Sequence, residues 1–82
     1  MRLDKFLKVS RIIKRRTVAN EVSEMGYILV NEKPAKPSKQ LKVGDIIKIE
    51  YHNRTVVAKV LIIPQNNVSI QESNTLYELI EE

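Results

Sequence analysis

The sequence contains no cysteine, no tryptophan and a single histidine, and these absences exclude several kinds of protein. Without cysteine there is no disulfide framework, no thiolate nucleophile and no cysteine-ligated metal. Because zinc sites draw mainly on cysteine and histidine, His52 alone is a poor basis for one. We therefore predict a protein without a metal or another cofactor.

Glycine and long apolar runs are also scarce. Gly26 and Gly44 are the only glycines, so no glycine-rich loop can cradle a nucleotide phosphate. The longest strictly apolar run, Val60 to Ile63, is far too short to span a bilayer. The first residues, Met1 to Lys5, are not followed by the apolar stretch of a signal peptide. We expect a cytoplasmic protein that does not contact membranes.

No pattern of residues indicates catalysis. The carboxylates are scattered through segments that have structural explanations, and no serine has a histidine base in an obvious arrangement. His52 falls in an expected turn, where it would simply be exposed. These observations predict a binding protein rather than an enzyme.

Charge is distributed unevenly along the 82 residues, which have room for one domain. Residues 1–42 contain eleven Lys or Arg against four Asp or Glu, whereas residues 43–82 contain three against six. Near the N-terminus only Asp4 opposes a run of basic side chains: Arg2, Lys5, Lys8, Arg11, Lys14, Arg15 and Arg16. A surface that serves solubility alone usually mixes its charges. The imbalance favours a surface that binds nucleic-acid phosphates.

Two further features of the charge pattern each have two interpretations. A second basic cluster repeats every three residues in a segment expected to be an extended loop: Lys33, Lys36, Lys39 and Lys42. This loop either folds beside the second helix and widens the basic surface, or is merely solvated. Asp4 either stabilises the start of the first helix or holds Arg2 or Arg16 in place for RNA, and both roles are compatible.

The apolar spacing predicts two helices near the N-terminus. Leu3, Phe6 and Leu7 share one face of the first, expected over Leu3–Ile13. Thr17 is expected to be the N-cap of the second helix, and Gly26 its left-handed C-terminal residue. The second helix would carry an apolar stripe of the kind that faces a core, formed by Val18, Val22 and Met25.

Strands are predicted in the rest of the chain. Tyr27–Val30 reads as a short strand, with Tyr27 in the core like Phe6. Ile46–Tyr51 alternates between apolar and charged residues, and Thr55–Ile63 is predicted to be a second long strand after a turn, so the two should form an antiparallel hairpin. Leu76–Ile80 is either a terminal helical turn or an edge strand. The order of elements is that of an α+β domain.

Four segments of the chain, taken together, resemble the alpha-L RNA-binding domain known from small-subunit ribosomal protein S-four. They cover roughly residues 2–50 and are Arg2–Leu7, Arg15–Ala19, Gly26–Asn31 and Val43–Ile47. The resemblance implies two N-terminal helices packed on a small, mainly antiparallel sheet. Residues 1–64 would form this domain, and residues 65–82 a C-terminal extension. It also implies that structured RNA docks on the helical face.

Two groups of small proteins within this family fit the chain best. Arg2–Glu21 is similar to factors of bacterial ribosome-associated quality control, and Lys36–Lys39 is similar to the fifteen-kilodalton heat-shock proteins. The first similarity implies binding to large-subunit rRNA and peptidyl-tRNA on split, stalled large subunits. It also implies assistance to a partner, RqcH, that extends the stalled chain with alanine. We expect a monomer.

The resemblance also implies which residues contact the RNA. The implied set is Arg2, Asp4, Lys5, Arg15 and Arg16, with Arg16 the strongest candidate. The charge pattern adds the nearby basic residues Lys8, Arg11, Lys36 and Lys39. The family often has Asn-Gly in the first sheet turn, where this chain has Asn31-Glu32. Because glutamate would be strained in a type I′ turn, we expect a longer turn or another type.

Other functions fit the same basic surface. A ribosome-assembly factor would bind immature rRNA, and a protein-interaction adaptor would present the basic face to an acidic partner. Two short helices can also mimic a DNA-binding helix-turn-helix. The basic residues favour the first helix and the junction over the outer face of the second, which argues against groove reading.

Overall fold

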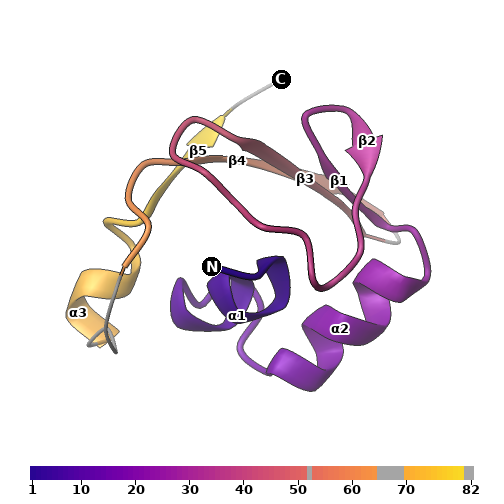
Figure 1. Cartoon of the computed structure of the whole chain (residues 1–82), viewed down its shortest axis with the longest axis horizontal. Helices are drawn as coiled ribbons and strands as arrows, with labels where there is room; N and C mark the ends of the chain where they lie inside the picture. Colours follow the sequence, from indigo (N-terminus) through magenta and orange to yellow (C-terminus); the bar gives the residue numbers. More distant parts are fainter. Residues whose placement is uncertain (52, 65–69, 81–82) are drawn as a thin grey trace.

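The computed structural model describes residues 1–51, 53–64 and 70–80 and has the α+β architecture predicted above. In chain order the elements are α1 (Leu3–Val9), α2 (Arg16–Glu24), β1 (Ile28–Val30), β2 (Lys33–Pro34), β3 (Ile46–Glu50), β4 (Thr55–Val60), α3 (Ile70–Ser73) and β5 (Tyr77–Ile80). Helices α1 and α2 lie together on one side of the sheet (Figure 1). His52 and residues 65–69, which carried part of the expected turn and C-terminal extension, lie outside the described residues.

The sheet has the strand order β2-β1-β3-β4-β5, and every neighbouring pair is antiparallel. Its inner face carries Ile28, Ile47 and Ile49, none of which is exposed to solvent. The alternation along β3 therefore places apolar side chains toward the helices and Lys48 outward. The predicted hairpin is confirmed as β3 and β4, although β4 ends at Val60, earlier than expected. Of the two alternatives for the C-terminal segment, the edge strand is the one observed.

Helix α1 buries the predicted face but is shorter than predicted. Leu3, Phe6 and Leu7 are completely buried between α2 and the sheet. The helix ends at Val9 rather than Ile13, because Arg11 adopts a left-handed conformation with φ 62°. Such a residue cannot continue a right-handed helix, so the chain turns here toward α2.

Helix α2 begins at Arg16, with Arg15 as its N-cap, so the prediction that Thr17 caps it is wrong. Its C-terminus is as predicted: Gly26 has φ 84°. The N–H of Gly26 donates to the carbonyl of Ser23 (3.0 Å), and the N–H of Tyr27 donates to that of Val22 (3.1 Å). These two bonds define a Schellman motif, which satisfies the last carbonyls of the helix.

The apolar stripe predicted for α2 is not its buried side. Ala19 and Ser23 are buried instead, whereas Val18 is 42% exposed and Met25 69% exposed. Tyr27, predicted to be in the core, is 47% exposed. Small side chains allow a helix to approach its neighbours closely, and this close packing outweighs the burial of the larger valine and methionine.

The first sheet turn has the conformation that glutamate was expected to prevent. Val30 pairs with Lys33, which leaves Asn31 and Glu32 as a two-residue loop with φ 53° and 71°. Positive φ at both central residues is the signature of a type I′ turn. Asn31 stabilises it across the sheet: its Nδ2 donates to Asp45 Oδ1 and its Oδ1 accepts from the Ile46 N–H, both at 3.0 Å.

We expect Glu32→Gly to raise the free energy of unfolding by about 0.5–1 kcal/mol. Left-handed conformation costs a residue with a Cβ about 1–2 kcal/mol, and the greater freedom of glycine in the unfolded chain cancels part of that gain. Urea denaturation followed by circular dichroism measures the difference. The matched control is Lys33→Gly, on a β2 residue without positive φ, and it should destabilise the protein. A lower stability for Glu32→Gly would contradict the turn assignment.

Candidate nucleic-acid interface

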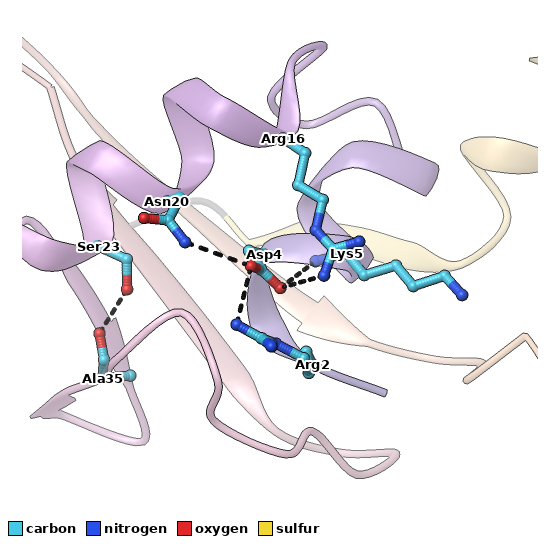
Figure 2. Close-up of polar contacts among 7 residues, drawn as sticks. All are labelled: Arg2, Asp4, Lys5, Arg16, Asn20, Ser23 and Ala35. Carbon is cyan, nitrogen blue, oxygen red and sulfur yellow. Dashed lines mark hydrogen bonds and ion pairs between the residues drawn. The ribbon is translucent and has the colours of Figure 1, made fainter.

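Asp4 is the centre of a polar cluster that joins the starts of α1 and α2 (Figure 2). Its side chain is only 3% exposed. The carboxylate accepts hydrogen bonds from Arg2 Nη2 (3.3 Å), Arg16 Nη2 (3.4 Å), the Lys5 N–H (2.8 Å) and Asn20 Nδ2 (3.5 Å). We call these five residues the Asp4 cluster. Asp4 therefore lies in the first turn of α1 and also holds the side chains of Arg2 and Arg16 in place.

The secondary structure explains how the cluster assembles. Arg2 is the N-cap of α1, so its side chain starts beside the first turn that carries Asp4. Arg16 and Asn20 are four residues apart on α2 and therefore project from the same side of that helix. Packing of α1 against α2 then brings one carboxylate within reach of both arginines.

The arginines keep much of their binding capacity. The side chains of Arg2 and Arg16 are 47% and 45% exposed, and Asp4 engages one Nη atom of each. A guanidinium carries five N–H donors in a planar fork, so the remaining donors can bind phosphate oxygens in pairs. An arrangement in which a buried anion orients two exposed guanidinium groups is chemically suited to binding phosphate.

Two opposing effects act on the pKa of the Asp4 carboxyl. Burial by itself raises that pKa. The hydrogen bond and positive charge of Arg16, the Lys5 N–H and the Asn20 amide together outweigh burial, so the pKa lies below its ordinary value. Asp4 is therefore ionised at neutral pH and able to hold both arginines.

The lowered pKa predicts acid sensitivity. Asp4 should contribute stability above the pKa of an unfolded aspartate, about 3.9, and lose that contribution as the pH falls through its lower folded value. Below about pH 4, the free energy of unfolding should therefore fall more steeply for the native protein than for Asp4→Asn. Urea denaturation at successive pH values tests this. Parallel curves for the two proteins would show that Asp4 is not coupled to folding.

The second basic cluster lies beside the helices. The N–H groups of Leu3 and Asp4 donate to the carbonyls of Lys39 (2.8 Å) and Pro37 (3.1 Å), which satisfies two donors that begin α1. The buried Ser23 hydroxyl donates to the Ala35 carbonyl at 2.6 Å, which ties the same loop to α2 (Figure 2).

The loop also forms the wall of a basic groove. The groove has a volume of about 590 Å³, and its lining includes Lys33, Lys36 and Lys39. Of the two interpretations of this cluster, the structure therefore supports the wider basic surface over a merely solvated loop.

The remaining predicted residues near the N-terminus are all exposed. Lys8 lies on α1, Arg11 in the connection between the helices and Arg15 at the N-cap of α2. Sequence reasoning missed Asn20 and Ser23 as positioning residues. Asn20 follows Arg16 by one helical turn, so the correct helix start at Arg16 would have indicated it. Ser23 gave no such signal, because its partner carbonyl is brought close only by the fold.

Metal-binding clusters and membrane-spanning helices are both absent from the described residues. Among these residues, no three aspartate or glutamate side chains form a group that could hold a metal ion. None of the helices in these parts of the chain combines the length and apolarity that crossing a membrane requires.

Comparison with known proteins identifies relatives along the whole chain. The S4 domain family matches residues 1–47. The chain is 49% identical over 82 residues to the RQC P-site tRNA stabilizing factor of Streptococcus pneumoniae and covers 92% of that protein. It is 40% identical over 82 residues to the protein of the same name from Bacillus subtilis and covers 94% of it.

Solved structures agree with these relationships. The Vibrio cholerae heat shock protein 15, described as trimeric, matches with a TM-score of 0.87 and 29% identity, over 98% of this chain and 81% of that one. The hypothetical protein HP1423 matches with a TM-score of 0.84 and 30% identity, over 100% and 99% of the two chains. The resemblance to the alpha-L domain and to both groups of small proteins is confirmed. The chain belongs to the S4 domain family and, within it, to the group that contains the RQC P-site tRNA stabilizing factors.

Proposed function

We propose that this protein is a non-enzymatic RNA-binding factor of ribosome-associated quality control. It binds large-subunit rRNA and peptidyl-tRNA on split, stalled large subunits and so keeps the tRNA in place. The observation that carries the proposal is the Asp4 cluster, which presents Arg2 and Arg16 as an oriented, half-exposed pair. The relatives named for stabilising a P-site tRNA indicate which RNA is relevant.

The proposed contact surface combines oriented and flexible cations. Arg2 and Arg16 take phosphate oxygens with their planar forks, and lysines at the rim add longer-range attraction. The full proposed set is Arg2, Lys5, Lys8, Arg11, Arg15, Arg16, Lys36 and Lys39, with Asp4 acting through the arginines. All of these residues lie within the proposed domain, residues 1–64. Such a surface recognises the shape and backbone of folded RNA rather than base sequence.

Binding two RNAs at once explains how a small basic domain could stabilise a tRNA. A protein already bound to rRNA presents its remaining cations to the neighbouring tRNA at a high effective concentration. The tRNA then dissociates more slowly, and the stalled chain stays available to the partner RqcH for alanine tailing. No chemical step is required of this protein, whose action is binding alone.

Sedimentation of the tagged protein from lysate on a sucrose gradient tests this function. Each fraction is probed for the protein and for peptidyl-tRNA. We expect co-migration with free large subunits that carry peptidyl-tRNA, and loss of that co-migration for Arg16→Ala. Migration with precursor particles that lack tRNA would contradict the proposal and favour ribosome assembly. A protein that stays at the top of the gradient at low salt would contradict ribosome binding altogether.

A further inference from the structure

Helix α2 has two exposed flanks of opposite character. With 3.6 residues per turn, Arg16 and Asn20 project to one side of the buried Ala19–Ser23 line. Val18, Val22 and Met25 project to the other side. The first flank belongs to the Asp4 cluster, whereas the second takes no part in it. Val18 and Met25 therefore remain exposed on this side of α2, and Val22 is partly buried at the edge of the core.

The apolar side of α2 continues onto the sheet. The Schellman motif places Tyr27 next to Val22, and the Tyr27 carbonyl accepts a hydrogen bond from the Glu50 N–H at 2.8 Å. This bond brings the end of β3 against the end of α2. As a result, Val22, Tyr27, Glu50 and Tyr51 line a pocket of about 450 Å³.

These residues form one continuous surface, which we call the apolar flank: Val18, Val22, Met25, Tyr27 and Tyr51. Tyr51 is 36% exposed, and the Arg54 guanidinium lies 5.1 Å from the centre of its ring. Contiguous exposed apolar side chains on a small domain mark interaction sites more often than chance. Tyrosine and arginine are also the residue types that most often carry binding energy at protein interfaces.

The charges at the border of the apolar flank indicate the chemistry of its partner. Glu50 lines the pocket. Glu21 lies one helical turn from both Val18 and Met25, and it also lines a second pocket with Asp4, Arg16 and Asn20 on the other side of α2. Within the described part of the chain, neither carboxylate forms an ion pair. The Arg54 guanidinium beside Tyr51 offsets one of these two carboxylates, so the three groups together carry one negative charge. A net negative border attracts ammonium or guanidinium groups, and it therefore disfavours RNA and favours a cationic polypeptide.

We propose that the apolar flank is the docking surface for a basic amphipathic helix of a protein partner. The apolar face of that helix would pack on Val22, Met25 and Tyr27, and its lysines or arginines would meet Glu21 and Glu50. The domain would then hold RNA on one flank of α2 and a protein on the other. This inference rests on the apolar flank alone and stands whether or not the RNA is that of a stalled ribosome.

NMR spectroscopy of the ¹⁵N-labelled protein tests the proposal with synthetic probes. The first probe is an 18-residue amphipathic helix of leucine and lysine, the second replaces every lysine with glutamate, and the third is an eight-nucleotide single-stranded RNA. We expect the lysine peptide to shift the amide signals of the apolar flank and to bind at least tenfold more tightly than the glutamate peptide. Equal affinity for the two peptides, or shifts confined to other surfaces, would overturn the proposal. RNA that shifts the apolar flank while the lysine peptide does not would reassign it to base stacking.

Matched variants exclude general effects of charge and hydrophobicity. Met25→Ser should weaken binding of the lysine peptide at least threefold, whereas Val43→Ser, at a site 64% exposed in a different loop, should not. Glu50→Lys should weaken the lysine peptide and strengthen the glutamate peptide, whereas Glu78→Lys on β5 should do neither. Equal effects of each variant and its control would overturn the assignment of the partner to this flank.

Discussion

Asp4→Asn should weaken RNA binding about tenfold, even though it makes the basic face one unit more positive. If attraction between net charges governed affinity, removal of a carboxylate would strengthen the interaction with phosphates. The structure leads to the opposite expectation, because Asp4 accepts hydrogen bonds from four donors, two of them arginine side chains. Asparagine has a single side-chain oxygen and would turn its own NH₂ group toward one of those donors.

The loss of affinity has an entropic origin. A free arginine side chain loses up to about 1.5–2 kcal/mol of rotamer entropy when it is fixed. In the native protein the Asp4 carboxylate orients Arg2 and Arg16 before RNA arrives, so part of that cost falls on folding rather than on binding. Without the carboxylate, the rotamer entropy of the arginines is lost when RNA binds. A cost of about 1.4 kcal/mol raises the Kd for RNA tenfold. The free energy of unfolding should also fall by about 1–2 kcal/mol, since hydrogen bonds to a charged group are lost.

Fluorescence anisotropy with a labelled RNA hairpin measures the affinity of Asp4→Asn. Circular dichroism at the same temperature establishes that the variant is folded. The control is Glu21→Gln, which removes one negative charge from an exposed position on α2 and should bind RNA slightly more tightly than the native protein. If Asp4→Asn binds as tightly as Glu21→Gln, the Asp4 cluster does not preorganise the arginines.

Arg16→Ala should have the largest effect on RNA affinity, a loss of about tenfold to a hundredfold. The substitution removes a planar fork that can take two phosphate oxygens, and it also releases one of the restraints on Asp4. If about six phosphates are neutralised, the slope of log affinity against log salt for the native protein should be roughly −4 to −5. Arg16→Ala should make that slope shallower by about one unit. Arg16→Lys should restore the slope but only part of the affinity, because an ammonium cannot bind in a bidentate manner.

Titration of RNA affinity between low and moderate salt checks both expectations. The matched control is Arg54→Ala, which removes the same side chain and charge beside Tyr51 instead of beside Asp4. Its effect on RNA affinity should be small. Equal losses for the two alanine variants would mean that net charge alone governs binding. A flat salt titration of the native protein would refute phosphate contacts as its source.

Much of the candidate site could be predicted from the sequence, because the charge of a segment depends only on which residues it contains. The run of basic residues around a lone Asp4 is visible without any structure, and its concentration in the first sixteen residues already indicated a one-sided surface. The spacing of Leu3, Phe6 and Leu7 identified the buried face of α1 for a similar reason, since a helix repeats every 3.6 residues. The end of α2 at Gly26 could also be predicted, because helices commonly end at a glycine in the left-handed conformation.

Other features depended on contacts between distant parts of the chain. The apolar residues of α2 suggested the wrong buried side, because the helix packs through Ala19 and Ser23. Ser23 is buried against the Ala35 carbonyl twelve residues away, a partner that no local pattern reveals. Asn31 and Glu32 form a type I′ turn although glutamate disfavours positive φ. The pairing of Val30 with Lys33 and the hydrogen bonds of Asn31 across the sheet outweigh the strain at Glu32.

The sequence by itself determined the two N-terminal helices, the β3–β4 hairpin, the inward face of α1 and the basic character of the N-terminal half, but it did not indicate β2 or α3. These properties depend on the spacing and composition of nearby residues. Only the tertiary structure decided that Arg2 and Arg16 share one buried carboxylate, that the loop with Pro37 and Lys39 lies beside α1, and that Val18 and Met25 remain exposed. The physical reason is that each of these outcomes depends on which side of α2 packs against its neighbours. That side is selected by the close packing of small side chains, which exists only when the whole domain is folded.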